Sequence, residues 1–355
     1  MKTGIVGLPQ VGKTALFSML TGVTPVAGRR EDAVGVAKVP DDRLERLAEL
    51  YHPRKLTHAT LELVDVASLT EASLRDGTGI AELRGVDALI HVVRAFEDPS
   101  VPHAGGGIDP RRDIARLEFD LIVSDLGQVE KRRERVQKDL KKQRSAALAD
   151  EAALLERMQA QLEAEKPLRT MALTAAEEKL TRGFQFLSQK PILYALNVGE
   201  DQAADLAGAV AAADLAAEPA PKTGVVAVCA KIEAEIAGLP GEEAAAFLAS
   251  YGLQESGLTR LARAAYQLLG LISFFTAGED ECRAWTIAAG TRAVDAAAAI
   301  HTDLAKHFIR AEVIRWDELL ALGGEAAARE KGKLRLEGKD YIVKDGDVMH
   351  IRHSG

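Results

Sequence analysis

Eight residues near the start of the chain, Gly7-Leu8-Pro9-Gln10-Val11-Gly12-Lys13-Thr14, restrict the possible folds more than any other feature of the sequence. They match the pattern G-x-x-x-x-G-K-[ST], in which backbone N–H groups of a glycine-rich loop surround a nucleotide β-phosphate. In such a loop Lys13 contacts the β- and γ-phosphates, and the Thr14 hydroxyl binds Mg²⁺. A glycine-rich surface turn is the alternative interpretation. Because the motif lies between a predicted strand and a predicted helix, we favour a nucleotide-binding site.

Apolar segments alternate with helical segments around this motif and predict a parallel α/β sheet. The most apolar ones have the pattern of strands that are covered on both faces. The predicted strands are residues 3–6, 59–65, 87–96, 190–198 and 223–230. The predicted helices include residues 13–20 and 41–50.

A different pattern fills residues 113–187, where no strand is expected. Apolar residues recur there at spacings of three, four and seven, with charges between them, as in a helical hairpin or coiled coil. We interpret the apolar stripe as the core of the hairpin, with a partner-binding groove as the alternative. Residues 130–144 hold eight Lys or Arg against three Asp or Glu, a local charge of +5.

Strand-like segments dominate the chain after residue 270, with one helix expected over residues 294–306. This predicts a small α+β domain at the C-terminus. The predicted organisation is a first part of the nucleotide-binding domain (1–112), the helical insertion (113–187), a second part of the nucleotide-binding domain (188–272) and the C-terminal domain (273–355).

Composition excludes several classes of protein. The 355 residues are 47% hydrophobic and 28% charged, as in globular proteins of two or three domains. No apolar run approaches the roughly 20 residues of a membrane span, and no secretory signal is visible. Two cysteines are too few for a disulfide framework, so a cytoplasmic protein is expected. The 45 basic and 53 acidic residues give a net charge of −8. This excludes a nucleic-acid-binding protein whose whole surface is basic, but it allows a basic patch on one face.

Three further segments carry candidate site residues. Asp65 ends a predicted strand, where a carboxylate on the magnesium side is expected; a helix cap or turn aspartate is the alternative. Asn197-Val198-Gly199-Glu200 ends another strand, where GTP-binding proteins carry N-K-x-D, whose aspartate accepts the N1 and N2 donors of guanine. Here Val198 replaces the lysine that would stack on the base and Glu200 is one methylene longer, which weakens the case for guanine; a polar loop is the alternative. Cys229-Ala230-Lys231 ends the next strand and is expected to place N–H groups at the base edge.

With these segments in view, the sequence resembles the YchF/Obg-like ATPase family along nearly the whole chain. The matching segments include GLPQVGKTALF, LVDVASL, DALIHVVRAFEDP, PILYALNVGED, LLGLISFFTAGEDECRAWTIAAGT and KLRLEGKDYIVKDGDVMHIR. The resemblance implies an α/β P-loop NTPase sheet domain with an inserted helical hairpin or coiled coil and a C-terminal β-grasp-like TGS domain. It also implies a cytoplasmic, monomeric ATP hydrolase without membrane contact, whose insertion and TGS domain contact the ribosome, a ribosomal subunit or RNA.

The site expected from motif and resemblance combines phosphate, base and metal contacts. The expected nucleotide-binding residues are Leu8, Pro9, Gln10, Val11, Gly12, Lys13, Thr14, Ala15, Asn197, Val198, Glu200, Cys229, Ala230 and Lys231. Thr14 and Asp65 would bind Mg²⁺, the bound nucleotide would be ATP or, as an alternative, GTP, and Lys13 is the expected catalytic residue. No side-chain general base is identified.

Departures from the family pattern fall on residues that sense or cleave the γ-phosphate. Gln10 replaces an asparagine, Arg29 aligns with a magnesium-sensing threonine, and Ser68 replaces the glycine of D-x-x-G. The second switch keeps only Gly77 and Gly79 of its glycines. Leu69 aligns with an apolar family position that lacks the water-orienting glutamine, so slow turnover is expected. Three hypotheses remain: a slow ATPase, a nearly non-hydrolysing adaptor for ribosome or RNA, and a GTPase.

The charge distribution narrows where RNA or a ribosome would bind. Residues 273–355 hold 12 basic and 14 acidic residues, so the C-terminal domain offers no basic field. The basic segment 130–144 is therefore the first candidate, although such a segment is often only a solvated helix face.

Overall fold

The computed structural model describes residues 1–25, 33–66, 82–103, 106–143, 145–215 and 220–354. These residues form two compact units, each with its own sheet. Unit 1 comprises residues 1–35 and 62–264, and unit 2 comprises residues 36–61 and 265–355. Unit 2 thus draws a segment from the early part of the chain. The predicted arrangement of an α/β P-loop sheet, an inserted helical hairpin and a small C-terminal domain is confirmed.

The first sheet has the strand order β2-β4-β1-β5-β6-β7. Strands β4, β1, β5, β6 and β7 pair in parallel, as their apolar patterns predict. The strands are β1 (Lys2–Val6), β2 (Ala33–Val39), β4 (Ala59–Asp65), β5 (Ala88–Arg94), β6 (Ile192–Asn197) and β7 (Thr223–Val228). Every residue of β5 and β6 is buried, which explains their nearly continuous apolar sequences.

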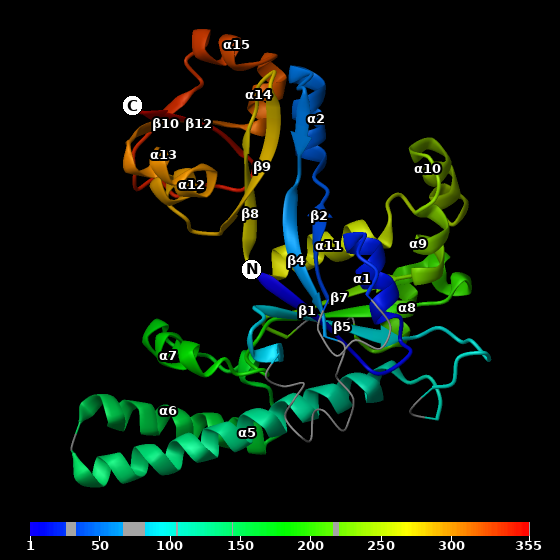
Figure 1. The fold of residues 1–355 in the computed structure, drawn as a ribbon, viewed down its shortest axis with the longest axis vertical. Helices are drawn as coiled ribbons and strands as arrows, with labels where there is room; N and C mark the ends of the chain where they lie inside the picture. The colour runs from blue at the N-terminus through cyan, green and yellow to red at the C-terminus, as the bar shows by residue number, and fades with distance from the viewer. Residues whose placement is uncertain (26–32, 67–81, 104–105, 144, 216–219, 355) are drawn as a thin grey trace. The chain divides into compact units, whose positions relative to one another are not determined.

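Helices complete unit 1 (Figure 1). They are α1 (Lys13–Thr21), α5 (Pro110–Lys142), α6 (Ala146–Glu163), α7 (Ala175–Thr181), α8 (Leu206–Ala212), α9 (Ala230–Ile236), α10 (Gly241–Ser250) and α11 (Gly257–Leu268), the last of which runs on into unit 2. Short 3₁₀ helices η1 (Leu168–Thr170), η2 (Arg182–Phe184) and η3 (Glu200–Asp205) occur between them.

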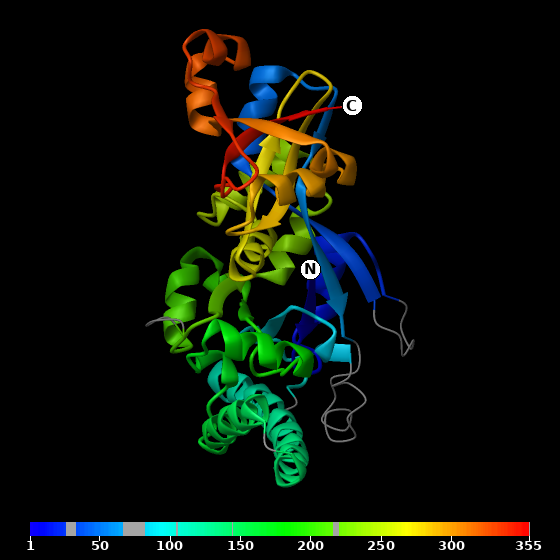
Figure 2. The same ribbon diagram turned by 90° about the vertical axis from the view of Figure 1, so that its left-hand side faces the viewer.

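The predicted hairpin is formed by α5 and α6, which lie side by side (Figures 1 and 2). Helix α5 begins with Pro110 after the N-cap Asp109, whose side chain accepts a hydrogen bond from the Arg112 N–H (3.0 Å). Its first half packs on the sheet, and its second half packs on α6. The residues of α5 in the sheet core are Ile114, Leu117 and Leu121, and those in the α5–α6 core include Ile122, Val129 and Val136. From Ile122 onward the apolar stripe is therefore hairpin core, as interpreted, whereas its first part belongs to the core of the sheet.

After the hairpin the chain returns to the sheet, and a buried polar network holds this returning segment against α5 and β6. The Arg169 guanidinium, 2% exposed, pairs with the Glu118 carboxylate of α5 and donates to the Ser188 carbonyl (3.2 Å). The Tyr194 hydroxyl of β6 donates to the same Glu118 oxygen (2.9 Å). One carboxylate thus connects α5, η1 and β6 inside unit 1.

The second sheet forms the body of unit 2, with the order β11-β10-β12-β8-β9-β3. Its strands are β3 (Lys55–Thr57), β8 (Leu271–Thr276), β9 (Glu281–Ala288), β10 (Phe308–Arg315), β11 (Arg335–Glu337) and β12 (Asp347–His353). Its helices are α2 (Asp42–Tyr51), α12 (Ala293–Ile300), α13 (Thr302–Lys306), α14 (Trp316–Leu322) and α15 (Glu325–Glu330). The predicted helix over 294–306 corresponds to α12 and α13, whereas α14 and α15 were not predicted.

Candidate nucleotide site

The backbone of the phosphate-loop motif has the conformation that its glycines permit. Gly7 and Gly12 have φ angles of +148° and +99°. A Cβ atom on Gly7 would lie 2.4 Å from the Val92 carbonyl oxygen, and one on Gly12 would lie 2.6 Å from Asn197 Nδ2. Glycine is therefore required at both positions by close approach as well as by backbone angle. The loop turns directly into α1, with Gly12 as its N-cap.

Lys13 folds back over this loop. Its ammonium group donates hydrogen bonds to the carbonyl oxygens of Gly7 (2.9 Å) and Leu8 (2.7 Å). Burial lowers the pKa of Lys13, and the nearby Asp65 carboxylate opposes this shift. The ammonium group thus lies at the loop, where a phosphate chain would need positive charge.

Thr14 and Asp65 come together as predicted. The Thr14 hydroxyl, in the first turn of α1, donates to Asp65 Oδ2 at the end of β4 (3.0 Å). The other oxygen, Asp65 Oδ1, is buried and has no hydrogen-bond partner among the described residues. Burial raises the pKa of Asp65, against the effects of the Thr14 hydrogen bond and the Lys13 charge. Asp65 Oδ1 is thus a buried carboxylate oxygen, close to the Thr14 hydroxyl, that is available to bind a ligand.

Asn197 connects the loop to the two following strands. Its Nδ2 donates to the Val11 carbonyl (3.0 Å), and its Oδ1 accepts from the Ala230 N–H (3.0 Å). The side chain therefore fixes the ends of β6 and β7 against the loop. Glu200, just beyond, forms an ion pair with Lys231 at the start of α9.

A cavity of about 830 Å³ opens beside these residues. Seven of the predicted site residues line it: Gly12, Ala15, Asn197, Val198, Glu200, Ala230 and Lys231. The adjoining loop and helix hold six more: Leu8, Pro9, Gln10, Val11, Lys13 and Thr14. Cys229, which directly precedes Ala230, is buried and does not line the cavity. Burial raises the pKa of the Cys229 thiol. The structure thus brings the loop and the strand-end motifs to one place.

The segment 96–99, which was not among the predicted site residues, also lines the cavity. It follows β5, whose carboxyl end lies between those of β1 and β6. The buried Arg94 holds it by donating to the carbonyls of Phe96 (3.1 Å), Asp98 (3.3 Å) and Val101 (2.9 Å). Its guanidinium carbon lies 4.4 Å from the centre of the Phe96 ring. The carboxyl ends of parallel strands are where ligands bind in α/β sheets, which is the signal that could have identified Phe96.

Five residues named in the sequence analysis lie outside the described residues: Arg29, Ser68, Leu69, Gly77 and Gly79. Within the described part of the chain, no cluster of three or more His, Cys, Asp or Glu residues has the geometry of a metal site. That part also contains no helix of the length and apolarity that a bilayer crossing needs.

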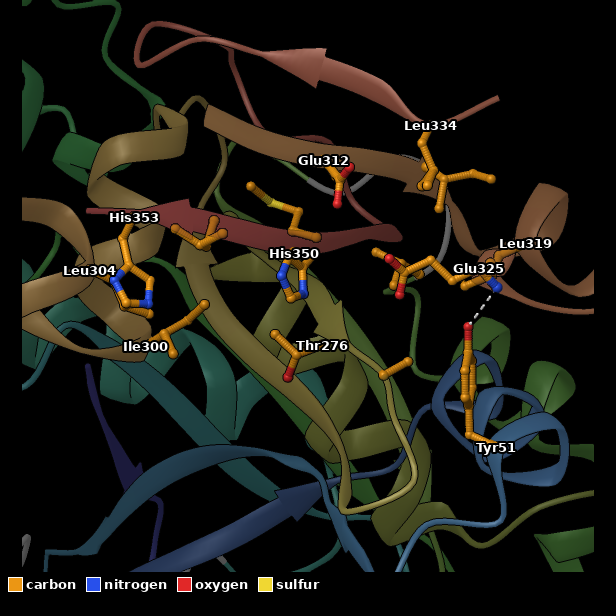
Figure 3. A pocket seen from close by; sticks show the side chains of 15 residues that line it. Tyr51, Thr276, Ile300, Leu304, Glu312, Leu319, Glu325, Leu334, His350 and His353 are labelled. Atoms are coloured by element: carbon orange, nitrogen blue, oxygen red, sulfur yellow. Dashed lines mark hydrogen bonds between the residues drawn. The ribbon is translucent and has the colours of Figure 1, made fainter. Parts of the chain in front are cut away.

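A second cavity, of about 280 Å³, lies within unit 2 (Figure 3). The Glu312 carboxylate points into it from β10, beside His350. Both Glu312 oxygens are already bound: one accepts from Arg352, and the other from Arg329 Nη2 (3.3 Å). The Tyr51 hydroxyl accepts from the Glu325 N–H (3.2 Å). The Glu312 and Tyr51 groups of this cavity are thus bound by other groups of unit 2.

A glycine-rich loop between the first strand and first helix of a parallel sheet, with an acidic residue from a neighbouring strand at its threonine, defines a P-loop NTPase. The chain is 44% identical to "Ribosome-binding ATPase YchF" of Bacillus subtilis (strain 168), covering 99% of each chain. It is 43% identical to the protein of the same name from Escherichia coli O157:H7, covering 99% of this chain and 98% of that protein. The chain belongs to the YchF family.

Two further comparisons agree with membership of the YchF family. The family model YchF-GTPase_C, described as a protein of unknown function (DUF933), matches residues 271–354. A solved structure described as the Schizosaccharomyces pombe YchF GTPase superposes with a TM-score of 0.84 at 29% identity, covering 99% of this chain and 97% of that one. The resemblance stated from the sequence is therefore confirmed.

Proposed function

We propose that this protein binds ATP in preference to GTP and hydrolyses it slowly, with Mg²⁺. The observation that carries the proposal is the cavity beside the loop, whose wall presents Val198 and Glu200 where guanine readers carry lysine and aspartate. The bacterial relatives are named ATPases, whereas the fission-yeast structure is named a GTPase, so the names alone do not decide the base. Phe96 and Val198 offer apolar surfaces to either purine.

Thr14 and Asp65 fit the needs of a magnesium ion. Mg²⁺ prefers oxygen ligands and keeps few protein contacts when it is bound together with phosphates. The unpartnered Asp65 Oδ1 and the Thr14 hydroxyl are such oxygens. When bound there, the ion would neutralise charge on the β- and γ-phosphates.

Electrostatic stabilisation carries the proposed hydrolysis. The N–H groups of the loop and the Lys13 ammonium would contact the phosphates of a bound nucleotide, and pre-placed donors of this kind stabilise charge that develops in the transition state. We identify no side-chain general base. Leu69, which takes the position of a water-orienting glutamine, supports slow turnover.

The nucleotide preference is tested by displacement of a fluorescent nucleotide from the full-length protein. We expect ATP to displace the probe at lower concentration than GTP, because Glu200 is one methylene longer than the guanine-reading aspartate and Val198 replaces the lysine that would stack on the base. A lower dissociation constant for GTP would contradict the proposed preference and favour the GTPase hypothesis.

We propose a second role, docking on the ribosome or its RNA, which the relatives' name and a surface of α5 support. In this proposal the protein acts as a cytoplasmic monomer. Lys131, Arg135, Lys138 and Lys142 are exposed and have no ion pair within the described residues; we call them the basic stripe. Their spacings of four, three and four residues place them on one face of α5. The buried Val129 and Val136 lie on the opposite face.

Replacing all four stripe residues with glutamine is expected to weaken binding to RNA or ribosomal subunits by about tenfold or more. Four lost phosphate contacts should reduce the slope of log affinity against log salt concentration by about 3. Co-sedimentation or filter binding at several salt concentrations measures both. A matched variant loses four exposed lysines elsewhere in unit 1 (Lys2, Lys166, Lys179 and Lys222 to glutamine). Equal slopes for both variants would exclude the basic stripe as the contact.

A further inference from the structure

Glu200 and Lys231 form an ion pair in the wall of the cavity, next to Asn197 and Val198. Glu200 begins η3 after β6, and Lys231 is the second residue of α9 after β7; both side chains line the cavity. The Lys231 ammonium donates to Glu200 Oε2. The backbone of this lysine is fixed, because the preceding Ala230 N–H is bound to Asn197 Oδ1 (3.0 Å). The Glu200 hydrogen bond raises the pKa of Lys231, which keeps the ammonium charged.

The two purines make opposite demands on a carboxylate at this place. Guanine presents two donors, N1–H and N2–H, and needs a negative acceptor that is free to take both. Adenine presents an acceptor at N1 and has no donor at C2. In the Glu200 carboxylate, one oxygen already accepts a hydrogen bond from the Lys231 ammonium, and the positive charge of that ammonium offsets part of the negative charge. Such a carboxylate is a weaker acceptor for the two guanine donors.

We propose that Lys231 is a specificity-determining residue that acts through Glu200: by holding its carboxylate in an ion pair, Lys231 lowers the affinity of the cavity for guanine nucleotides relative to adenine nucleotides. This inference rests on the proposed nucleotide function. The side chains of Lys231 and Glu200 are 68% and 34% exposed. Ion pairs with such exposure are weak, so the lysine adjusts the preference by a few-fold and does not create it alone.

The test replaces Lys231 with methionine, which keeps an unbranched side chain of nearly the same length and removes the charge. Dissociation constants for ATP and GTP are measured by displacement of a fluorescent nucleotide from the full-length protein. We expect GTP to bind about three- to fivefold more tightly and ATP to change by less than about twofold. Lys222→Met is the matched control, since Lys222 also pairs with a glutamate (Glu178, 3.6 Å) but lies outside the cavity.

A second substitution assigns the effect to the carboxylate. Glu200→Gln in the Lys231→Met background is expected to remove the gain for GTP, because an amide has one oxygen acceptor in place of two. An unchanged ratio of the two affinities in Lys231→Met, or a gain that survives Glu200→Gln, would overturn the role of Lys231. Wild-type protein that binds neither nucleotide would instead overturn the proposed function.

Discussion

Replacing Lys13 with alanine is expected to lower single-turnover ATP hydrolysis about 100- to 1000-fold, the usual effect of removing one pre-placed donor to a developing negative charge. The ammonium group lies at the loop, within hydrogen-bond distance of the Gly7 and Leu8 carbonyls. It is the one side-chain cation of the phosphate-loop motif. Its loss therefore removes transition-state stabilisation that no other residue of the motif replaces.

The assay uses excess protein over radiolabelled ATP with Mg²⁺ present. Lys131→Ala, which removes an exposed lysine of α5, is the control and should keep wild-type turnover. If Lys13→Ala hydrolyses ATP at the wild-type rate, the turnover does not come from this site. The adaptor hypothesis would then be the better account of the chain.

Replacing Arg169 with methionine is expected to lower the free energy of unfolding of unit 1 by about 3–5 kcal/mol, as when one partner of a buried ion pair is removed. Arg169 and Glu118 are 2% and 13% exposed, so the remaining carboxylate would lie in the interior with only the Tyr194 hydroxyl as donor. Adding Glu118→Gln removes this buried charge and should restore at least half of the loss.

Urea unfolding followed by far-ultraviolet circular dichroism measures this change, with hydrogen exchange in β6 and α5 to localise it. Tryptophan fluorescence would not report on unit 1, since Trp285 and Trp316 both belong to unit 2. Arg157→Met is the control, because the Arg157–Glu177 pair is 51% and 19% exposed and should contribute less than about 1 kcal/mol. An equally small effect of Arg169→Met would show that the buried network does not stabilise the fold.

Local sequence patterns predicted the features that depend on neighbouring residues. The phosphate loop was predictable because its glycines and its Lys13-Thr14 pair are adjacent in the chain. The strands of the parallel sheet were predictable because burial on both faces demands continuous apolar runs, and the hairpin because α5 and α6 share one apolar period.

Several features that depend on distant contacts were not predicted, although the meeting of Thr14 and Asp65 was. The position of Phe96 just after β5 places it at the ligand-binding edge of the sheet, but the Arg94 hydrogen bonds that hold its loop at the cavity have no local sequence pattern. Strand β2 was not predicted, because it exposes Val34 and Val36 and buries Ala37, so its sequence lacks the usual alternation of apolar and polar residues. The division of α5 between two cores was also missed, since a single apolar stripe does not reveal which partner covers each half.

The length of α5 decides where the basic stripe lies. At 1.5 Å per residue the 33 residues of the helix span about 50 Å, so Lys131 and Lys142 lie about 30 and 50 Å along its axis from Pro110. The first half of the helix packs on the sheet and the second half packs on α6. A partner that contacts the basic stripe would therefore bind the part of α5 that α6 supports, tens of ångströms along the helix from the part that packs on the sheet.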